Sequence, residues 1–359
     1  MSLFLVYLAT PLGVAFMSVE GKRVSKQVEG HTLADWRPTA SIETLRQRAR
    51  LIAEVRAFFA ERGVLEVETP VLGRGGSTDV HLASLSALAT TPAGRERLWM
   101  QTSPEFHMKR LLAAGSGPIF QLARSFRDGE VGRRHNIEFT MLEWYRPGFS
   151  LDDLIGETSA LVSHVHPGVP KELPAVANRR RYRELFREAL SIDPFTSELA
   201  DLRQLATERG GLDMTESDRD GCLDLLMGLV IEPTLGRDGL DVVVDYPASQ
   251  AALARRHRDP EDGQWVASRF ELYLEGLELA NGYDELTDAA EQAARFAEDN
   301  VARRALKLPE VDVDHRLVAA LEQGLPAGSG VALGLDRLIQ LALNKKSVAE
   351  VMAFATPVA

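Results

Sequence analysis

Two β-rich runs that flank a charged loop constrain the fold of this 359-residue chain most strongly. Residues 119–126 and 138–145 are rich in apolar, branched and aromatic side chains, which favour strands. The polar segment between them, residues 127–136, is longer than most hairpin turns. Long loops more often carry function than short ones. We therefore expect an antiparallel pair of strands whose connecting loop belongs to a functional site.

The rest of the pattern predicts an α+β fold, with an antiparallel sheet flanked by helices. Helical signals separate strands that lie far apart in the sequence, which argues against a parallel α/β sheet. Neither the glycine pattern of dinucleotide-binding folds nor that of phosphate-binding P-loops is present. The expected helices cover 41–63, most of 151–235, 288–306 and 336–343, and the further strands cover 64–70, 241–246, 269–279 and 331–335.

Composition narrows the class of protein. The chain has 41 Lys and Arg against 52 Asp and Glu, a net charge of −11, which argues against binding nucleic acid through bulk charge. The single cysteine, Cys222, has leucine neighbours and is expected to be buried and inert. Residues 3–16 are apolar but too short to span a bilayer. We expect a cytoplasmic enzyme whose residues 1–35 form a poorly ordered extension, with Met17 as an alternative start.

Three separated segments resemble the signature motifs of class II aminoacyl-tRNA synthetases over residues 36–355. They are Glu66-Val67-Glu68-Thr69-Pro70, Phe126-Arg127-Asp128-Gly129-Glu130 with the run from Arg133 to Tyr145, and the segment from Gly330 to Leu338. The resemblance implies one catalytic domain over residues 36–355, with a helical insertion at about 151–235. In this family the first motif builds a dimer interface, so a homodimer with Pro70 near its axis is expected.

A closer resemblance is to lysyl-tRNA synthetases, and closer still to their bacterial paralogues, the elongation factor P lysine ligases. It rests on Thr102–Leu111, on Glu278–Leu286, and on Ser103 and Ala332, where lysyl-tRNA synthetases usually have Ala and Gly. About 40 residues precede the first helix, too few for an anticodon-binding domain. The resemblance therefore implies elongation factor P as the protein substrate, with no tRNA and no membrane partner.

The implied reaction uses ATP and Mg²⁺ to activate lysine or (R)-β-lysine as an adenylate, which is then passed to a lysine ε-amine of elongation factor P. Cations must neutralise charge at the α-phosphate, a role for Arg127 and Arg337 as catalytic residues. The ATP contacts implied by the resemblance are Arg127, Asp128, Glu130, Asn136, Glu271, Leu272, Gly334 and Arg337. The Mg²⁺ ligands would be Glu271 and Glu278. The substrate contacts would be Ser103, Pro104, Glu105, Tyr145, Glu278 and Ala332.

The second motif departs from the family pattern at one position. The family has Phe-Arg-x-Glu, whose Glu reads the adenine amino group, whereas here Gly129 stands at that place and Glu130 follows it. The loop keeps the family length, so this is a substitution. Either Glu130 turns into the site or the backbone alone reads adenine.

Other interpretations stay open at this point. A truncated lysyl-tRNA synthetase-like enzyme acting on tRNA and an inactive synthetase-like regulatory protein are the alternative functions. The choice between lysine and (R)-β-lysine is also open. Individually, Glu271 and Glu278 could be solvated faces of a hairpin, and Glu275 is expected to be one. Residues 179–183, rich in arginine, are expected to begin a solvated helix, and Asp201, Glu208 and Asp213 are expected on helix surfaces.

Overall fold

The computed structural model describes residues 36–169 and 177–359, so the predictions for residues 1–35 lie outside it. The described chain divides into two compact units. The first unit consists of residues 36–169 and 284–359, and the second unit of residues 177–283. Each is described by itself.

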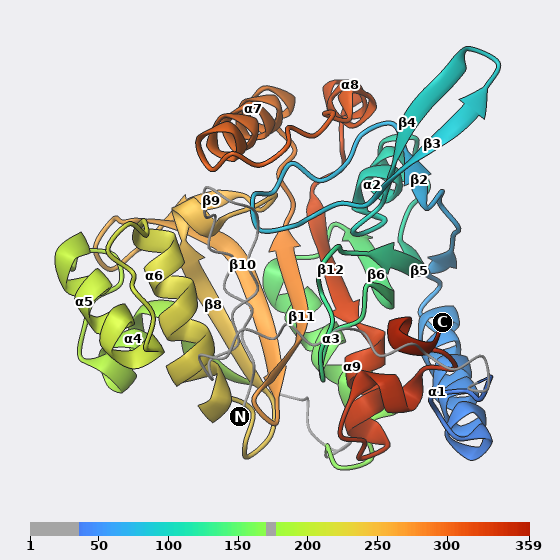
Figure 1. Ribbon diagram of the computed structural model, residues 1–359, viewed down its shortest axis with the longest axis horizontal. Helices are drawn as coiled ribbons and strands as arrows, with labels where there is room; N and C mark the ends of the chain where they lie inside the picture. Colours follow the sequence, from blue (N-terminus) through green and yellow to red (C-terminus); the bar gives the residue numbers. More distant parts are fainter. Residues whose placement is uncertain (1–35, 170–176) are drawn as a thin grey trace. The chain divides into compact units, whose positions relative to one another are not determined.

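The first unit contains a sheet with the strand order β1-β5-β6-β12 (Figure 1). Strands β5 (Ile119–Phe126) and β6 (Glu138–Pro147) pair antiparallel along their length, which confirms the pair predicted from the sequence. Strand β12 (Gly328–Gly334) pairs antiparallel with the other edge of β6, and β1 (Leu65–Glu66) lies parallel to β5. The charged loop thus leaves and re-enters neighbouring strands at one end of the sheet.

Helix α1 (Ile42–Ala60) packs on this sheet. Ser41 caps it by accepting a hydrogen bond from the amide of the third helical residue, and Gly63 follows its end with φ +64°. Phe59 is fully buried and stacks on Phe120 of β5 with 4.5 Å between ring centroids. The predicted helix is confirmed, and its buried aromatic side chains fix α1 to the sheet.

The strand predicted over residues 64–70 was too long. Only Leu65–Glu66 pairs as a strand, followed by one further hydrogen bond from Val67 N–H to the Phe120 carbonyl. Pro70 has no N–H to continue a ladder, and it lies exposed. The alternation of apolar and polar residues therefore extends beyond the residues that pair with a neighbouring strand.

A smaller sheet in the first unit has the order β2-β4-β3, from Leu72–Gly73, Gly94–Met100 and Ser86–Thr91. The β3–β4 hairpin extends away from the body of this unit (Figure 1). The helices of the unit besides α1 are α2 (Glu105–Ala113), α3 (Leu151–Val165), α7 (Ala289–Ala305), α8 (His315–Gln323) and α9 (Leu335–Ala342), with short turns at Val348–Val351 and Thr356–Val358.

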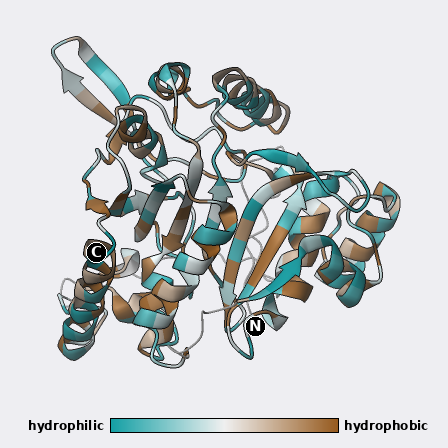
Figure 2. Ribbon diagram, turned by 180° about the vertical axis from the view of Figure 1, so that it is seen from behind, coloured by the Kyte–Doolittle hydropathy of each residue, from teal (hydrophilic) through white to brown (hydrophobic). Residues whose placement is uncertain are grey.

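The second unit is a sheet with the order β11-β10-β8-β7, to which β9 adds beside β10. Its strands are β7 (Asn178–Arg181), β8 (Asp241–Pro247), β9 (Arg256–Arg258), β10 (Trp265–Leu274) and β11 (Leu277–Asp284), and its helices are α4 (Tyr182–Leu190), α5 (Leu199–Gly210) and α6 (Arg219–Leu226). Hydrophobic residues concentrate along β8 and the helix faces that bury it (Figure 2). Cys222 is fully buried in this core, as expected.

The alternating run 269–279, predicted as one strand, is a hairpin. Strand β10 ends at Leu274, and β11 begins at Leu277. Between them Glu275 and Gly276 have φ of +54° and +72°, the left-handed pair that tight hairpin turns require. The alternation of residue types continues through the turn, although both faces of the two strands are buried beside it. Glu275 is exposed, as predicted.

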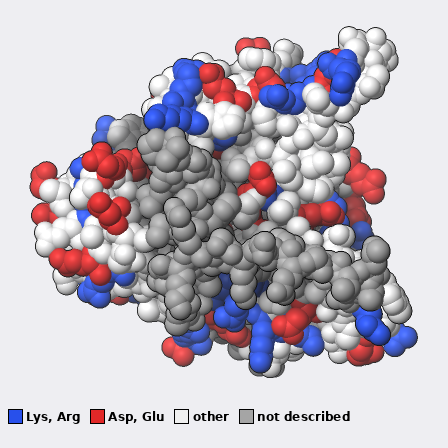
Figure 3. Space-filling model, in the orientation of Figure 1, with Lys and Arg blue, Asp and Glu red and all other residues white. Residues whose placement is uncertain are grey.

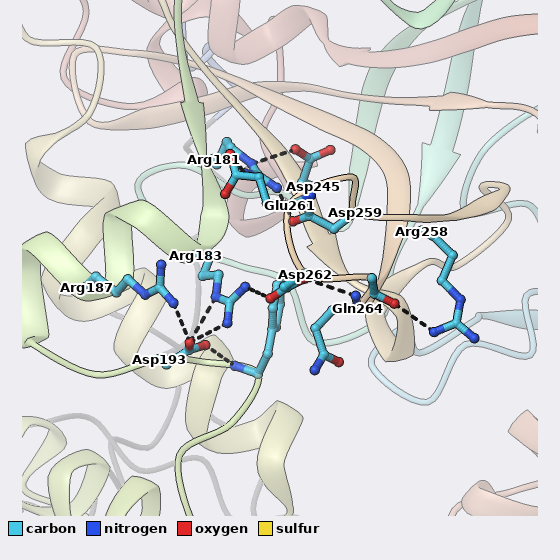
Figure 4. Close-up of polar contacts among 12 residues, drawn as sticks. Arg181, Arg183, Arg187, Asp193, Asp245, Arg258, Asp259, Glu261, Asp262 and Gln264 are labelled. Atoms are coloured by element: carbon cyan, nitrogen blue, oxygen red, sulfur yellow. Dashed lines mark hydrogen bonds and ion pairs between the residues drawn. The ribbon is translucent and has the colours of Figure 1, made fainter.

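The arginine-rich residues 179–183 do not begin a solvated helix. Asn178–Arg181 form β7, parallel to β8, and α4 follows. Arg181 pairs with Asp245 at 3.0 Å, and Arg183 with Asp193 at 2.6 Å (Figure 4). The carboxylate partners come from distant or later positions in the chain, so local sequence could not reveal that these cations are internally paired.

The acidic residues predicted on helix surfaces of the second unit are all exposed. Asp201 and Glu208 lie on α5 as expected, whereas Asp213 lies in the loop that follows α5, because the helix ends at Gly210. Acidic side chains spread over the helical side of this unit (Figure 3). Across the residues that the structure describes, none of the helices combines the length and the apolar character needed to cross a membrane.

Candidate functional site

A buried acidic cluster lies in the first unit. Its members are Ser103, Glu105 and Lys109 at the start of α2, Glu143 and Tyr145 on β6, and Glu285 just after β11. The side chains of Lys109 and Glu285 are 1% and 4% exposed, and Glu143 is 2% exposed. Burying several ionisable groups together is costly, so such a cluster marks a site rather than ordinary core.

Lys109 is the cation of this cluster. Its Nζ lies 2.6 Å from Glu105 Oε1 and 2.6 Å from Glu285 Oε2. These two carboxylates keep the lysine charged, and they raise its pKa against the opposing effect of burial. Lys109 and Glu105 are four residues apart in α2, so one helix face presents both.

Glu143 is held by hydroxyl groups rather than by a cation. Tyr145 Oη donates to Glu143 Oε1 at 2.5 Å, and Ser103 Oγ donates to Glu143 Oε2 at 2.8 Å. Burial raises the pKa of Glu143 to about 8, with a further contribution from the charge of Glu105. The cluster thus contains three carboxyl groups, of which Glu105 and Glu285 pair with Lys109 and Glu143 is held by hydroxyl groups.

One carboxylate oxygen of Glu285 lacks a hydrogen-bond donor. This atom, Oε1, is buried and has no hydrogen-bond partner within the described part of the chain. Burial raises the pKa of Glu285 to about 7, although Lys109 opposes the shift. A Cβ built on Gly330 of β12 would lie 2.5 Å from this oxygen and 2.3 Å from the Tyr145 ring. Glycine at position 330 thus lets Tyr145 and Glu285 lie directly against the backbone of β12.

A second cluster, the arginine cluster, lies where the charged loop meets α9. Arg337 Nη2 is 2.6 Å from His135 Nε2, and Arg337 Nε donates to the Arg134 carbonyl at 3.2 Å. Burial, together with the charges of Arg337, Arg127 and Arg134, lowers the pKa of His135 to about 3. His135 is neutral at physiological pH and sits among arginines, as suits a site for a polyanion.

Arg127, the residue directly after β5, also belongs to the arginine cluster. Its Nε is buried and has no hydrogen-bond partner among the described residues, while its Nη1 lies 3.9 Å from Glu130 Oε1. The guanidinium also lies 5.2 Å from the Phe139 ring centroid. Gly129 has φ +76°, so the turn that brings Glu130 beside Arg127 uses a conformation that favours glycine.

Two other predicted ATP contacts of the loop are engaged with the protein itself. Asn136 is buried, donates to the Glu138 carbonyl at 2.6 Å and accepts from the Thr356 amide at 2.9 Å. Asp128 is exposed, and its amide donates to the Ala83 carbonyl. These contacts fix the backbone of the loop beside Arg127, and the ATP contacts of both side chains stay predictions.

The remaining predicted residues of the first unit lie near the two clusters. Pro104 is buried at the start of α2, and Ala332 pairs across β12–β6 with Glu143. Gly334 ends β12 and precedes α9, and a Cβ there would touch only Arg337, at 3.4 Å and beyond. Strand β6 therefore connects the acidic cluster with the arginine cluster.

Three predicted residues lie in the second unit. The register of β10 and β11 places Glu278 opposite Tyr273, which shares a strand face with Glu271. Glu271 Oε2 accepts from Tyr246 Oη at 2.7 Å and from Tyr273 Oη at 2.5 Å, and Oε1 pairs with Arg269. Leu272 is buried on the opposite face, so a contact with ATP would fall to its backbone.

The donor set of Glu271 and Glu278 suits Mg²⁺. Both offer carboxylate oxygens from one face of an antiparallel pair, and Mg²⁺ prefers such ligands. Burial lowers the pKa of Arg269, but the carboxylates of Glu271 and Glu278 raise it, and the pKa is raised overall. This strand face therefore already holds one cation, the guanidinium of Arg269. In the described residues no three His, Cys, Asp or Glu side chains converge as metal ligands.

Sequence reasoning missed several members of these clusters. Glu143, Glu285, Lys109 and His135 all stand inside the quoted motif segments but were given no role. Glu143 precedes Tyr145 by two residues, so the strand period already placed both on one face. Burial of Lys109 had no sequence signal, because its two carboxylate partners come from different elements.

The comparisons with known proteins agree with this arrangement. Residues 29–357 match the family model of class II tRNA synthetases (D, K and N). The chain belongs to this family, and it is a ligase with the α+β fold that the motifs predicted. An antiparallel-dominated sheet flanked by helices is what the structure contains in each unit.

Several relatives of this chain carry the same protein name. A protein of Pasteurella multocida named elongation factor P--(R)-beta-lysine ligase is 48% identical over 322 residues, which cover 89% of this chain and 97% of the relative. Proteins of the same name from Actinobacillus succinogenes and Erwinia tasmaniensis are each 49% identical, with the same coverage. The resemblance to elongation factor P lysine ligases is thereby confirmed.

Proposed function

We propose that this chain is a cytoplasmic enzyme that activates lysine or (R)-β-lysine with ATP and transfers the acyl group to a lysine ε-amine of elongation factor P. In the first step a carboxylate oxygen of the substrate attacks the α-phosphorus, and pyrophosphate leaves. In the second step the acceptor amine attacks the acyl carbon, loses a proton, and AMP leaves. No protein side chain needs to act as a nucleophile in either step.

The open acceptor in the acidic cluster is the single observation that carries the proposal. Glu105 and Glu285 both pair with Lys109, and Glu285 Oε1 has no partner among the described residues. A buried acceptor without a donor is costly unless a ligand supplies one. An ammonium group of the substrate at Glu285 Oε1 would supply the missing donor.

The arginine cluster supports the nucleotide half of the proposal. Arg127 and Arg337 offer guanidinium groups suited to phosphate and carboxylate oxygens. Because His135 stays neutral, it adds no further positive charge to the cluster. Glu271 and Glu278 would hold Mg²⁺, which supplies neutralisation of the triphosphate charge when it is bound. Arg127 would orient the substrate carboxylate against the α-phosphate, and Arg337 would bind the phosphate tail.

The names of the relatives support the acceptor. Their printed name specifies elongation factor P and (R)-β-lysine for those proteins. For this chain we propose the same acceptor and the same class of substrate, a diamino acid. Ser103 and Ala332 border the acidic cluster on the side of Glu143, where they are placed to affect how a displaced amine fits.

We also propose a homodimer that uses α1 and the segment after it. Leu65 and Val71 are 55% and 42% exposed, and the neighbouring Pro70 is exposed as well. Apolar side chains exposed together near one element are typical of protein interfaces. A second copy of the chain would cover them around a twofold axis.

Two assays test the proposal. Exchange of pyrophosphate into ATP should depend on lysine or (R)-β-lysine, because adenylate formation is reversible. Incubation with ATP, the substrate and elongation factor P should then raise the mass of elongation factor P by one acyl group. Exchange without transfer would contradict elongation factor P as the acceptor. Charging of tRNA instead would favour the lysyl-tRNA synthetase-like alternative. Absence of exchange would favour an inactive regulatory protein.

A further inference from the structure

Arg48 of α1 makes a buried contact that reaches the arginine cluster. Its Nη2 lies 2.6 Å from Asp336 Oδ1, and the two side chains are 13% and 5% exposed. The same Nη2 donates to Thr140 Oγ1 on β6 at 3.1 Å, and Nη1 donates to the Val351 carbonyl at 3.4 Å. Arg48 thus joins three separate segments with one planar group.

Asp336 carries this connection to the nucleotide side. It stands in the first turn of α9, directly before Arg337. Its Oδ2 accepts the Thr140 amide at 2.7 Å, which fixes the start of α9 against β6. On the same turn Arg337 extends to His135 and to the Arg134 carbonyl. The position of Arg337 therefore depends on Asp336, and Asp336 is neutralised by Arg48.

We infer that Arg48 is a positioning residue for ATP binding, acting through Asp336 on Arg337. The inference rests on the proposed function, which assigns Arg337 to the phosphates of ATP. It gives α1 a second role besides the proposed dimer contact. Without Arg48, Asp336 would be a buried carboxylate that lacks its counterion, and the first turn of α9 would have to move to solvate it.

The arrangement requires an arginine. The guanidinium reaches Asp336, Thr140 and Val351 from a single rigid fork. A lysine could keep the ion pair with Asp336, but one ammonium group does not reproduce this geometry. Arg48→Lys should therefore keep part of the positioning of Arg337, whereas Arg48→Met should lose this positioning completely.

The test measures the KM for ATP and the KM for lysine in pyrophosphate exchange, for Arg48→Met, Arg48→Lys, Asp336→Asn and the double variant Arg48→Met with Asp336→Asn. A displacement of about 1 Å at a reacting group costs roughly 100-fold. We expect Arg48→Met to lower kcat/KM for ATP by roughly 30- to 100-fold through a raised KM, with the KM for lysine changed less than about twofold. The double variant should be no worse than the poorer single variant.

Arg146→Met is the matched control. Arg146 pairs with Glu157 at 3.4 Å, their side chains are 13% and 7% exposed, and the pair does not include Asp336 or Thr140. This variant should lose stability comparable to that of Arg48→Met while its KM for ATP stays unchanged. An unchanged KM for ATP in Arg48→Met, or equal rises for ATP and lysine, would overturn the inference.

Amide hydrogen exchange separates this inference from the proposed function. The Thr140 amide should exchange faster in Arg48→Met and in Asp336→Asn than in Arg146→Met. If the wild-type chain shows no pyrophosphate exchange, the proposed function fails. The contact from Arg48 to α9 is then judged by the Thr140 amide alone, and equal protection in all variants would refute it.

Discussion

Binding of a diamino acid should release protons from the acidic cluster. In the ligand-free protein burial holds the pKa of Glu143 at about 8 and that of Glu285 at about 7. An ammonium group within about 4–6 Å lowers a carboxyl pKa by roughly one to three units. Both groups would then ionise as the ligand binds, and their protons would leave to the solvent.

The size of the effect follows from these pKa values. With a pKa of about 8, Glu143 is protonated in about nine molecules of ten at pH 7, and Glu285 in about half. We expect between about one and about one and a half protons released per ligand at pH 7. The release should fall toward zero above pH 8, and the dissociation constant should fall about tenfold per pH unit between pH 6 and pH 7.5.

The assay is calorimetry of lysine binding in buffers of different ionisation enthalpy, because the observed heat then varies with the number of protons released. Glu143→Gln is the key variant, since glutamine mimics the protonated form without titrating. Its proton release at pH 7 should drop to about half a proton. Its affinity at pH 8 should fall roughly 10- to 100-fold, the usual loss when a hydrogen-bonding group near a charge is neutralised.

Stability supplies an independent readout. The folded-state pKa of Glu143 lies above its unfolded value, so the folded protein binds more protons and loses stability as pH rises from about 5 to about 8. Glu143→Gln should remove this loss, raising the free energy of unfolding of the ligand-free protein at pH 8 by up to roughly 4 kcal/mol. Proton uptake on binding, or a pH-independent dissociation constant between pH 6 and pH 8, would refute the reasoning.

Three further predictions concern other parts of the first unit. Gly330→Ala should weaken lysine binding roughly 10- to 100-fold because its Cβ would collide with Tyr145, whereas Gly156→Ala, which meets open space, should bind normally; equal lysine titrations would refute this. Glu130→Ala should raise the KM for ATP about threefold by removing the carboxylate beside Arg127, and an unchanged KM would leave adenine to the backbone. Sedimentation velocity at micromolar concentration should show a dimer that Leu65→Glu dissociates, and a monomeric wild type would contradict the interface.

The sequence predicted the elements that carry strong local signals. The β5–β6 pair follows from branched and aromatic residues on either side of a polar loop, and α1 follows from its apolar stripe and its Ser41 cap. Signals that depend on distant partners were misread. The turn at Glu275 was not located, because the alternation of residue types continues across it. The arginines of β7 were expected in solvent because their carboxylate partners lie elsewhere in the chain.

The motifs predicted which residues belong to the candidate site, but not the burial and the neighbouring charges of those residues. Arg127 and Arg337 do come together, through His135, which the motif alone left without a role. In the acidic cluster, Glu105 and Tyr145 were predicted, but the strongest perturbations fall on Glu143 and Glu285. Burial creates these perturbations, and burial of a carboxyl group cannot be read from a motif.

Recognition of the terminal ammonium is decided by pyrophosphate exchange into ATP with lysine, with (R)-β-lysine, and with norleucine, which has the length of lysine without its terminal ammonium. Exchange should require a terminal ammonium and should fall in Gly330→Ala, whose added methyl group would collide with Tyr145 and Glu285. Equal exchange with norleucine, or no exchange with any of the three, would contradict it.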